Sequence, residues 1–496
     1  MLLLESLYLL STAMLAIYGL NTLYHTWVYW QFRKQDILQT PKPFTVLETI
    51  RVTPTVTVQL PIYNERHVAR RLIDAVANLD WPAQHLHIQV LDDSTDDTCQ
   101  IVAGTIARYQ DKGLTIDHIR RPNRQGYKAG ALQQGLATTQ GEFIAIFDAD
   151  FIPLSDFLQK AIPCFADSTI GCVQTRWGHV NPDVSGLTKA QALGIDGHFI
   201  VEQQARHQMG AFLNFNGTAG VWRRRCMDDA GGWEGDTLTE DLDLSYRAQL
   251  RGWRIHYRPD VVAPAELPVQ IDAFKRQQFR WAKGSLQTAI KLFGKLWISH
   301  NPFWRKALGT LHLTNYLVHP LMVLNLLLIW PMTFSESFVL RLAPFFTVAA
   351  IGPPLMYWAS MSAQDVPWPA RLRQLALLLA LGTGLSVNNT RAAIEAIFRI
   401  RSAFKRTPKF AVTDKQRHWQ TSSYALPKDH TAWVELALAV YATVLLVYSL
   451  SIGMWWVVLW LILYSFSYSY IASLAFVQAW QCNAARSAIP GLSTIE

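Results

Sequence analysis

Residues Phe143–Asp150 read FIAIFDAD, an apolar run followed by two aspartates that flank one small alanine. A short apolar run bounded by polar residues indicates a buried strand. Comparable runs recur along this part of the chain, and helical patterns lie between them. The strand-like runs are Val56–Leu60, Ile88–Leu91, Leu114–Ile119, Phe143–Phe147 and Gly171–Thr175, and the helical patterns are His67–Leu79, Thr98–Tyr109 and Lys128–Thr138. This alternation predicts an α/β domain with a mostly parallel sheet.

Acidic residues follow two of these runs directly. Asp92 and Asp93 close the second run, and Asp148 and Asp150 close the fourth. In open α/β sheets ligands bind beyond the carboxyl ends of the strands, so these carboxylates are candidate ligands. Carboxylate oxygens suit Mg²⁺ or Mn²⁺, which typically bridges a diphosphate. The sequence contains no GxxxxGK[ST] motif, which excludes a P-loop.

Further candidates lie downstream. Lys128 opens a predicted helix, where the ammonium group and the helix N-terminus both favour a phosphate, although a lone surface lysine is an ordinary feature. Glu240 and Asp241 lie at the acidic N-terminus of a predicted helix. Carboxylates at this position either cap the helix or act as a general base. Arg280 could neutralise a leaving diphosphate, and Trp281 offers either a flat face for a sugar ring or ordinary packing.

Long apolar stretches lie outside this domain. The lengths predict five membrane spans, near 2–32, 307–334, 338–360, 431–451 and 453–479. Arg33 and Lys34 follow the first span directly, so the positive-inside rule places the α/β domain in the cytoplasm. The stretch 371–398 contains several polar residues and precedes a basic cluster, which favours an amphipathic helix in the cytoplasmic interface.

A polar stripe interrupts the second predicted span. His312, Asn315, Tyr316 and His319 fall at positions i, i+3, i+4 and i+7 of an apolar helix. They could hydrogen-bond neighbouring helices, or they could line a hydrated sugar pathway.

Composition excludes other classes of protein. The net charge of +8 has no long basic block with interleaved aromatic residues, so a nucleic-acid partner is not expected. The five cysteines form no CxxC pair, which disfavours a zinc site or a disulfide framework.

The motifs together resemble the processive family 2 glycosyltransferases, the group of cellulose synthases and cellulose-synthase-like mannan and glucan-backbone synthases. The resemblance covers about residues 55–300. It is carried by PIYNE (61–65), DDSTD (92–96), YKAGAL (127–132), DAD (148–150), TED (239–241) and QxxRW (277–281). Residues 410–415, FAVTDK, look like the FxVTxK gating loop of cellulose synthases, and NFNGTAG (214–220) and NNTR (388–391) look like the mannan and glucan-backbone synthases.

The resemblance implies a GT-A fold and a role for each matching residue. Asp241 would be the catalytic base, and Asp148 and Asp150 would hold the metal. The donor nucleotide or diphosphate would contact Asp92, Asp93, Lys128, Asp148, Arg280, Thr413 and Lys415. The acceptor would contact Glu240, Gln277 and Trp281, and the gating loop would comprise Phe410, Val412, Thr413 and Lys415. Enzymes of this kind invert the anomeric centre and use a nucleotide-diphosphate sugar such as UDP-glucose or GDP-mannose.

The expected organisation is a transmembrane helix (1–34), a cytoplasmic GT-A domain with interface helices (35–300), two transmembrane helices (301–362), an interface helix with the gating loop (363–430), and two transmembrane helices with a short tail (431–496). The expected location is the plasma (inner) membrane. Processive synthesis and translocation of a β-glucan or mannan is the first hypothesis. Single transfer to a lipid acceptor is the second, and a non-catalytic membrane scaffold is the third.

Overall fold

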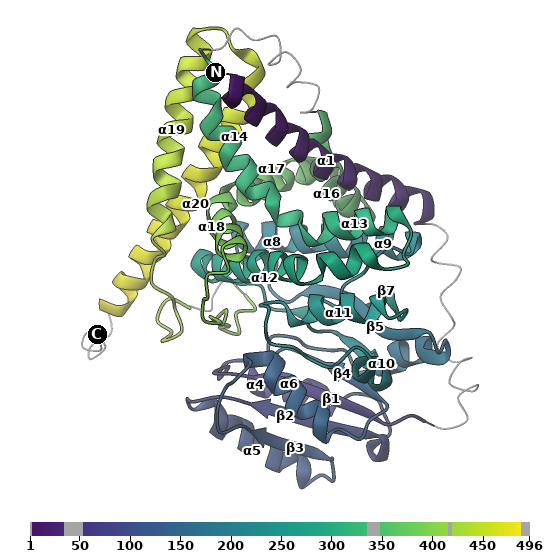
Figure 1. Cartoon of the computed structure of the whole chain (residues 1–496). Coiled ribbons are helices and arrows are strands. Elements are labelled where there is room, and N and C mark those ends of the chain that lie inside the picture. The colour runs from purple at the N-terminus through teal and green to yellow at the C-terminus, as the bar shows by residue number, and fades with distance from the viewer. Residues whose placement is uncertain (1, 34–52, 335–347, 415–418, 488–496) are drawn as a thin grey trace.

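The computed structural model describes residues 2–33, 53–334, 348–414 and 419–487. It consists of an α/β domain at the lower end of Figure 1 and a region of long helices at the upper end. The chain enters the helical region first, forms the α/β domain, and then returns to the helices.

One seven-stranded sheet forms the centre of the α/β domain, in the order β3-β2-β1-β4-β6-β5-β7. All neighbouring strands pair in parallel except β6, which is antiparallel to both β4 and β5. The strands are β1 Val56–Ile62, β2 Leu86–Asp92, β3 Ile116–Arg120, β4 Phe143–Ile146, β5 Ile170–His179, β6 Gly220–Arg223 and β7 Arg254–Ala265.

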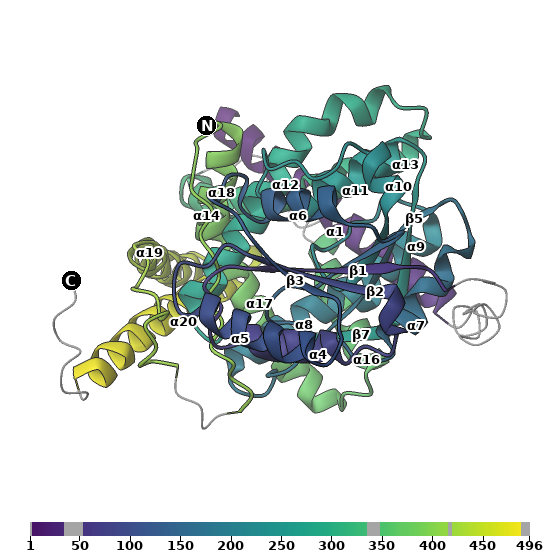
Figure 2. The same ribbon diagram turned by 90° about the horizontal axis from the view of Figure 1, so that it is seen from below.

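Helices cover both faces of the sheet (Figure 2). One face packs against α4 (Ala69–Ala77), α5 (Thr98–Gln110) and α7 (Phe157–Ala161). The other face packs against α6 (Tyr127–Thr138), α10 (Arg224–Asp229) and α11 (Glu240–Leu250). All four residues of β4 are therefore buried, as expected for a central strand that is covered on both sides. Short helices η1 (Ala83–His85) and η2 (Ile162–Ala166) complete the layers.

The predicted α/β class and all five predicted strands are confirmed. The sequence did not indicate β6 or β7. β6 has only four residues, and it begins with a glycine. β7 carries charged residues and two prolines, so neither strand shows a clean apolar run.

Among the described residues, four helices of the helical region are long and apolar enough to cross a membrane, by length and composition. These are α1 (Leu2–Phe32), Asn315–Met332, α19 (Thr431–Ser451) and α20 (Trp455–Ser487). The span Asn315–Met332 comprises η4 (Asn315–Leu317) and α14 (Val318–Met332). The remaining helices in the described part of the chain are α8 (Gly186–Asp196), η3 (Gly197–Gln203), α9 (Gln204–Met209), α12 (Ile271–Ile298), α13 (Phe303–Leu313), η6 (Val348–Ile351), α16 (Gly352–Ala363), α17 (Trp368–Gly384) and α18 (Ser386–Ile397).

The predicted spans correspond only in part to these helices. The stretch 307–334 is divided near Thr314 between α13 and α14 rather than forming one helix. The stretch 338–360 begins outside the described residues and ends within the twelve-residue helix α16. The stretch 371–398 forms two helices, α17 and α18, that meet at Leu385.

Buried ion pairs connect α12 to the C-terminal helices. Lys275 Nζ lies 2.6 Å from Glu435 Oε2 of α19, and the two side chains are 2% and 0% exposed. Lys283 Nζ lies 2.8 Å from Glu395 of α18, and it also donates to the carbonyl of Ile400. These pairs fix α12 between the α/β domain and the helical region.

Replacing Glu435 by Gln should lower the free energy of unfolding by about 3–5 kcal/mol, because the buried Lys275 ammonium loses the carboxylate with which it forms its ion pair. Thermal unfolding in detergent measures the effect. Lys189→Met is the matched control, since it breaks an exposed pair with Asp183 that contributes at most about 1 kcal/mol. Equal losses of stability in the two variants would contradict this account.

Candidate active site

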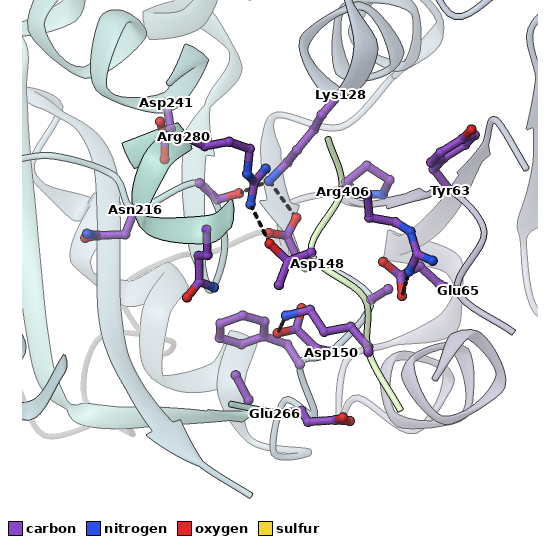
Figure 3. Close-up of a pocket in the computed structure, with 18 of the residues that line it drawn as sticks. Tyr63, Glu65, Lys128, Asp148, Asp150, Asn216, Asp241, Glu266, Arg280 and Arg406 are labelled. Carbon is purple, nitrogen blue, oxygen red and sulfur yellow. Dashed lines mark hydrogen bonds and ion pairs between the residues drawn. The ribbon is translucent and has the colours of Figure 1, made fainter. Parts of the chain in front are cut away.

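One cavity lies at the carboxyl ends of β1, β2 and β4 (Figure 3). The sheet topology brings these strand ends together, and the start of α11 and the middle of α12 close the cavity from the side of the helical region. The sequence-predicted residues that line it are Asp93, Lys128, Asp148, Asp150, Glu240, Asp241, Gln277, Arg280 and Trp281. Residues from five distant motifs therefore share one cavity.

Lys128 lies at the first turn of α6 and faces a cluster of carboxylates. Its Nζ lies 2.5 Å from Asp148 Oδ1 and 3.9 Å from Glu240 Oε1, and it donates to the carbonyl of Gly217 at 2.9 Å. Burial alone would lower the pKa of Lys128, but the neighbouring carboxylates outweigh this effect and raise it. The lysine is therefore a permanent positive charge in the cavity.

Asp241 is the second residue of α11, and the pKa of its carboxyl group lies close to neutral pH. Burial raises the pKa of Asp241 to about 7, with a further contribution from the Glu240 charge, while Lys128 opposes the shift. The Leu242 amide donates to its Oδ1 at 2.8 Å. Gly217 lies opposite, where an added Cβ would come within 2.7 Å of Asp241 Oδ2, so this loop position requires glycine. A carboxylate with a pKa near the working pH suits general-base chemistry.

Arg280 and Trp281 reach the cavity from adjacent positions on α12. The Arg280 guanidinium lies over the Phe404 ring, 4.7 Å from its centroid, and its Nε is buried without a hydrogen-bond partner. The Trp281 ring lies 6.3 Å from the ring of Trp177, between centroids. An anion in the cavity could satisfy Arg280, and Trp281 presents an aromatic face beside it.

Asp92, the last residue of β2, and Asp93, which follows it, have different environments. Asp93 lines the cavity and pairs with Arg121, whose Nε donates to it at 2.9 Å. Asp92 does not line the cavity, and it is fully buried. Its two oxygens accept hydrogen bonds from the Ser94 amide and face His118 at 2.9 Å, which gives it a role in holding the strand end.

A segment that the sequence did not single out, residues 404–409, crosses the cavity. Lys409 forms an ion pair with Asp150, and Arg406 Nη1 lies 3.0 Å from Glu65 Oε2. Phe404 stacks on Tyr127 with a centroid separation of 5.4 Å. No motif marks these contacts, because they form only when residues far apart in the chain fold together.

The predicted gating-loop residues follow this segment. The amides of Phe410 and Val412 donate to Glu266 Oε1 at 2.9 and 3.3 Å, and both side chains are buried. Thr413 is exposed and does not line the cavity, and Lys415 lies outside the described residues.

Asp148 and Asp150 fit a divalent cation by their donor chemistry. Both carboxylates line the same cavity, and they flank Ala149 just beyond β4. Each now neutralises an ammonium group, Lys128 for Asp148 and Lys409 for Asp150, so positive charge is favoured at both positions. Hard oxygen ligands of this type bind Mg²⁺ or Mn²⁺.

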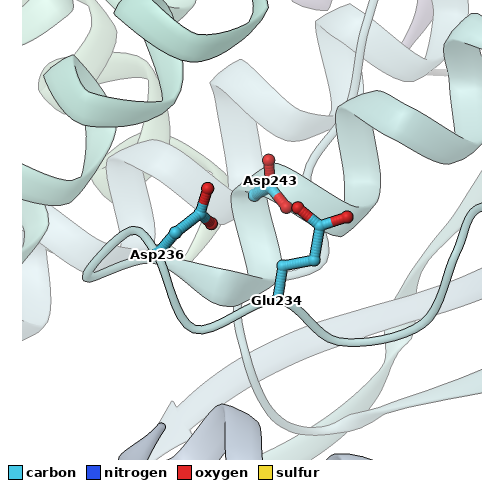
Figure 4. A group of neighbouring side chains, drawn as sticks. All are labelled: Glu234, Asp236 and Asp243. Atoms are coloured by element: carbon cyan, nitrogen blue, oxygen red, sulfur yellow. The ribbon is translucent and has the colours of Figure 1, made fainter.

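A second acidic group, Glu234, Asp236 and Asp243, lies near the start of α11 (Figure 4). The Lys291 ammonium lies within 3.0 Å of an oxygen of each residue. None of the three residues lines the cavity, and Lys291 pairs with all of them, so we assign this group as a structural ion-pair cluster.

A larger chamber of about 620 Å³ lies between the helices, next to the cavity. The two share residues at their junction, namely Trp177, Ile195, Asn216, Thr239, Asp241 and Trp281. All four residues of the polar stripe, His312, Asn315, Tyr316 and His319, line the chamber, although the helix breaks between them.

Comparison with known proteins agrees with this architecture. Residues 54–284, a little under half of the chain, match the family model described as Glycosyltransferase like family 2. Two relatives are 44% identical over 259 residues, which is 51% of this chain. They are a probable glucomannan 4-beta-mannosyltransferase 11 from Oryza sativa subsp. japonica and a glucomannan 4-beta-mannosyltransferase 2 from Arabidopsis thaliana. The chain spans about half the length of these relatives, 45% and 48%.

Among solved structures, the mannosyltransferase PcManGT from Pyrobaculum calidifontis in complex with GDP-Man and Mn²⁺ aligns with a TM-score of 0.53 and 21% identity, covering 80% of this chain and 100% of that one. The predicted GT-A fold and the resemblance to the cellulose-synthase-like glycosyltransferases are thus confirmed.

Lys409→Gln should increase the affinity for Mn²⁺, because it removes the ammonium group that competes for Asp150. We expect a change of about five-fold or more, which corresponds to roughly 1 kcal/mol. Isothermal titration of the EDTA-stripped protein with Mn²⁺ measures it. Lys405→Gln in the same segment is the matched control, since Lys405 is exposed. An unchanged affinity in Lys409→Gln would contradict the assignment of Asp150.

Proposed function

We propose that this chain, whose residues 54–284 form a family 2 glycosyltransferase domain, is an inverting membrane glycosyltransferase that extends a β-linked glycan from a nucleotide-diphosphate sugar. The observation that carries the proposal is the shared cavity of Asp241, Lys128, Arg280 and the Asp148–Asp150 pair, which shares Asp241 and Trp281 with the wall of the chamber. The names of the two plant relatives favour a mannosyl unit as the transferred sugar.

In this proposal Asp241 removes the proton from the acceptor hydroxyl as that hydroxyl attacks the anomeric carbon. A single base suffices for direct attack, which inverts the configuration at that carbon. Asp241 lies at the junction of the cavity and the chamber, so an acceptor in the chamber would meet a donor in the cavity beside it. Its pKa of about 7 matches the requirements of a base that works near neutral pH.

The leaving diphosphate would meet fixed positive charge. Lys128 and Arg280 both line the cavity, and Arg280 Nε has no partner among the described residues. A divalent cation held by Asp148 and Asp150 would add charge neutralisation for the diphosphate. Asp93, which pairs with Arg121 at the cavity wall, would contact the nucleotide.

The four apolar helices support an integral membrane protein, and the chamber supports a path for the product away from the catalytic cavity. We place the catalytic domain on the cytoplasmic side, because Arg33 and Lys34 directly follow the first span. Translocation of a polymer through the chamber is part of the proposal. The alternative is a single transfer to a lipid acceptor, and the product analysis below distinguishes it from polymer synthesis.

Purified protein in detergent should be incubated with Mn²⁺ and radiolabelled GDP-mannose, GDP-glucose or UDP-glucose in parallel. We expect a polymer from GDP-mannose that β-1,4-mannanase degrades. A single labelled sugar on an extracted lipid would replace the polymer-synthase proposal with lipid glycosylation. Absence of transfer from every donor would refute the proposed function.

Asp241→Asn should lower the transfer rate by about 10²- to 10⁴-fold, because the amide cannot accept the proton. Donor binding should remain within about two-fold, as titration calorimetry with the sugar nucleotide would show. Asp236→Asn is the control, since this exposed aspartate pairs with Lys291 and does not line the cavity. Substantial turnover in Asp241→Asn would remove this residue from the mechanism.

The pH dependence of the wild type follows from the same group. Because the pKa of Asp241 is raised to about 7, its basic form is present above that pH and is lost as the pH falls through it. The transfer rate should therefore fall about ten-fold from pH 8 to pH 6. A flat rate profile over this range would be inconsistent with Asp241 as the base.

If the chamber conducts the product, His319→Trp should shorten the polymer without changing donor binding, because the indole would narrow the chamber where His319 lines it. Gel-filtration sizing of labelled product measures the length. Leu327→Trp is the control, since Leu327 lies on the same helix with 46% of its surface exposed. Products of normal length would leave His319 as a packing residue that hydrogen-bonds Asn389.

A further inference from the structure

His179 is the last residue of β5, and it lines the cavity at the strand ends but not the chamber. Its Nε2 lies 2.9 Å from Asp196 Oδ1, and the two side chains are 10% and 9% exposed. The other ring nitrogen, Nδ1, is buried and has no hydrogen-bond partner among the described residues. The roles proposed above leave this histidine–aspartate pair without a function.

The end of β5 directs His179 toward the cavity. Side chains two residues apart on a strand share a face, so His179 lies on the same face as Trp177. The Trp177 ring lies 5.3 Å from the ring of Phe151, between centroids, and also lines the cavity. The pairing of β5 with β7 shifts its register between Thr175 and Arg176. Such irregularities are frequent next to active sites, where they re-aim the side chains that follow.

The strand pairing places His179 close to Asp150. Ala265 of β7 pairs with His179 on one side and forms a bridge with Phe151 on the other. The backbones of His179 and Phe151 are therefore about 10 Å apart, which is two strand spacings. The next residue, Glu266, donates its amide to the Asp150 carbonyl at 3.3 Å, and these two residues are neighbours in Figure 3. A sugar nucleotide bound beside Asp150 could therefore reach His179.

Asp196 determines which ring nitrogen of His179 carries the proton. A carboxylate oxygen accepts hydrogen bonds, so the proton of the neutral ring belongs on Nε2, which leaves a lone pair on Nδ1. Asp196 ends α8, and its second oxygen accepts from Gln364 Nε2 at 3.2 Å. Gln364 directly follows α16, so two helices hold the carboxylate in place. His179 is thereby fixed as a hydrogen-bond acceptor.

The lone pair on Nδ1 restricts the kind of group that can bind there. The oxygens of a diphosphate are acceptors and cannot satisfy it, whereas a sugar hydroxyl can donate to it. His179 lines the cavity that contains Lys128 and Asp148, while Trp177 lines both that cavity and the chamber. His179 therefore lies on the side of Trp177 where the sugar nucleotide is proposed to bind.

We propose that His179 Nδ1 accepts a hydrogen bond from a hydroxyl of the sugar that is transferred, and that Asp196 is a positioning residue that holds the ring in the required tautomer. The inference rests on the function proposed above and extends it to the choice of donor sugar. A hydrogen bond of this kind depends on where one hydroxyl lies on the ring. An epimer that directs this hydroxyl away would leave Nδ1 buried without a partner.

The test compares the binding of GDP-mannose and GDP to the full chain in detergent with Mn²⁺, by titration calorimetry. The two ligands share the nucleoside diphosphate, so the difference between them isolates contacts with the sugar. His179→Gln should bind GDP-mannose about three- to ten-fold more weakly, the change expected for one lost hydrogen bond. The glutamine amide can reach Asp196 but offers no acceptor at the position of Nδ1. The affinity for GDP should stay within about two-fold.

His179→Asn is the converse variant. Its amide oxygen lies near the position of Nδ1 and can accept the hydroxyl, but the side chain is too short to reach Asp196. It should therefore retain most of the affinity for GDP-mannose. Asp196→Ala should weaken the binding of GDP-mannose and leave that of GDP unchanged, because the imidazole ring is then free to turn.

His87→Gln is the matched control. His87 Nε2 lies 2.8 Å from Asp117 Oδ2, a pair of the same kind, and neither residue lines the cavity. This variant should bind both ligands as the wild type does. Thermal unfolding of every variant identifies any that is misfolded.

Several results would overturn the inference. Equal losses of GDP-mannose affinity in His179→Gln and His179→Asn would show that no acceptor at Nδ1 is needed. Weaker binding of Mn²⁺ alone in His179→Gln would assign Nδ1 to the metal instead. A raised acceptor KM with unchanged affinity for GDP-mannose would assign it to the acceptor.

The proposed function fails separately from the inference. A wild type that binds GDP-mannose but transfers no sugar would refute the proposed function, while the binding comparison would still decide the contact between His179 and the sugar. A wild type that binds no GDP-mannose would overturn the inference. If it also transfers sugar from no donor, the proposed function falls with it.

Discussion

The candidate active-site cavity concentrates carboxylates in a small buried space, and the structure depends on the cations that offset their repulsion. Lys128 compensates Asp148, Lys409 compensates Asp150, and Arg121 compensates Asp93. Each cation comes from a segment distant from its partner, so the charge balance also ties segments 404–409 and 121–128 to the strand ends. An uncompensated charge at this depth would be costly, which makes the cavity a point where folding and chemistry impose the same requirement.

The same balance explains why Asp241 differs from its neighbours. It lies at the N-terminus of a helix and near an ammonium group, and both features favour a negative charge. Burial and the adjacent Glu240 act in the opposite direction and prevail, which raises the pKa of Asp241 to about 7. A carboxylate that is fully compensated would be a weak base, and one that is uncompensated would be protonated. The partial compensation by Lys128 gives a group that can accept a proton near neutrality.

Sequence patterns were informative where the signal is local. The strands before Asp93 and Asp148 and the helix that begins at Lys128 each have their own periodicity, and parallel topology then predicts that their ends meet. The partners Lys409, Arg406 and Glu266 carry no local signature, because their positions depend on a return of the chain after more than a hundred residues. Asp92 and Asp93 also look equivalent in sequence, and only the alternation of faces at the strand end separates the buried one from the one that lines the cavity.

Helix α12 shows why the site cannot belong to the α/β domain alone. Arg280 and Trp281 reach the cavity from this helix, while Lys275 and Lys283 on the same helix form buried pairs with α19 and α18. A helix has a fixed rise and rotation per residue, so the two pairs also fix the axial position and rotation of the segment between them. Removing the C-terminal helices would remove the ion-pair partners of both lysines, and these contacts would no longer hold α12 in register with the sheet. The positions of Arg280 and Trp281 are therefore set jointly by the sheet and by α18 and α19, which pair with α12.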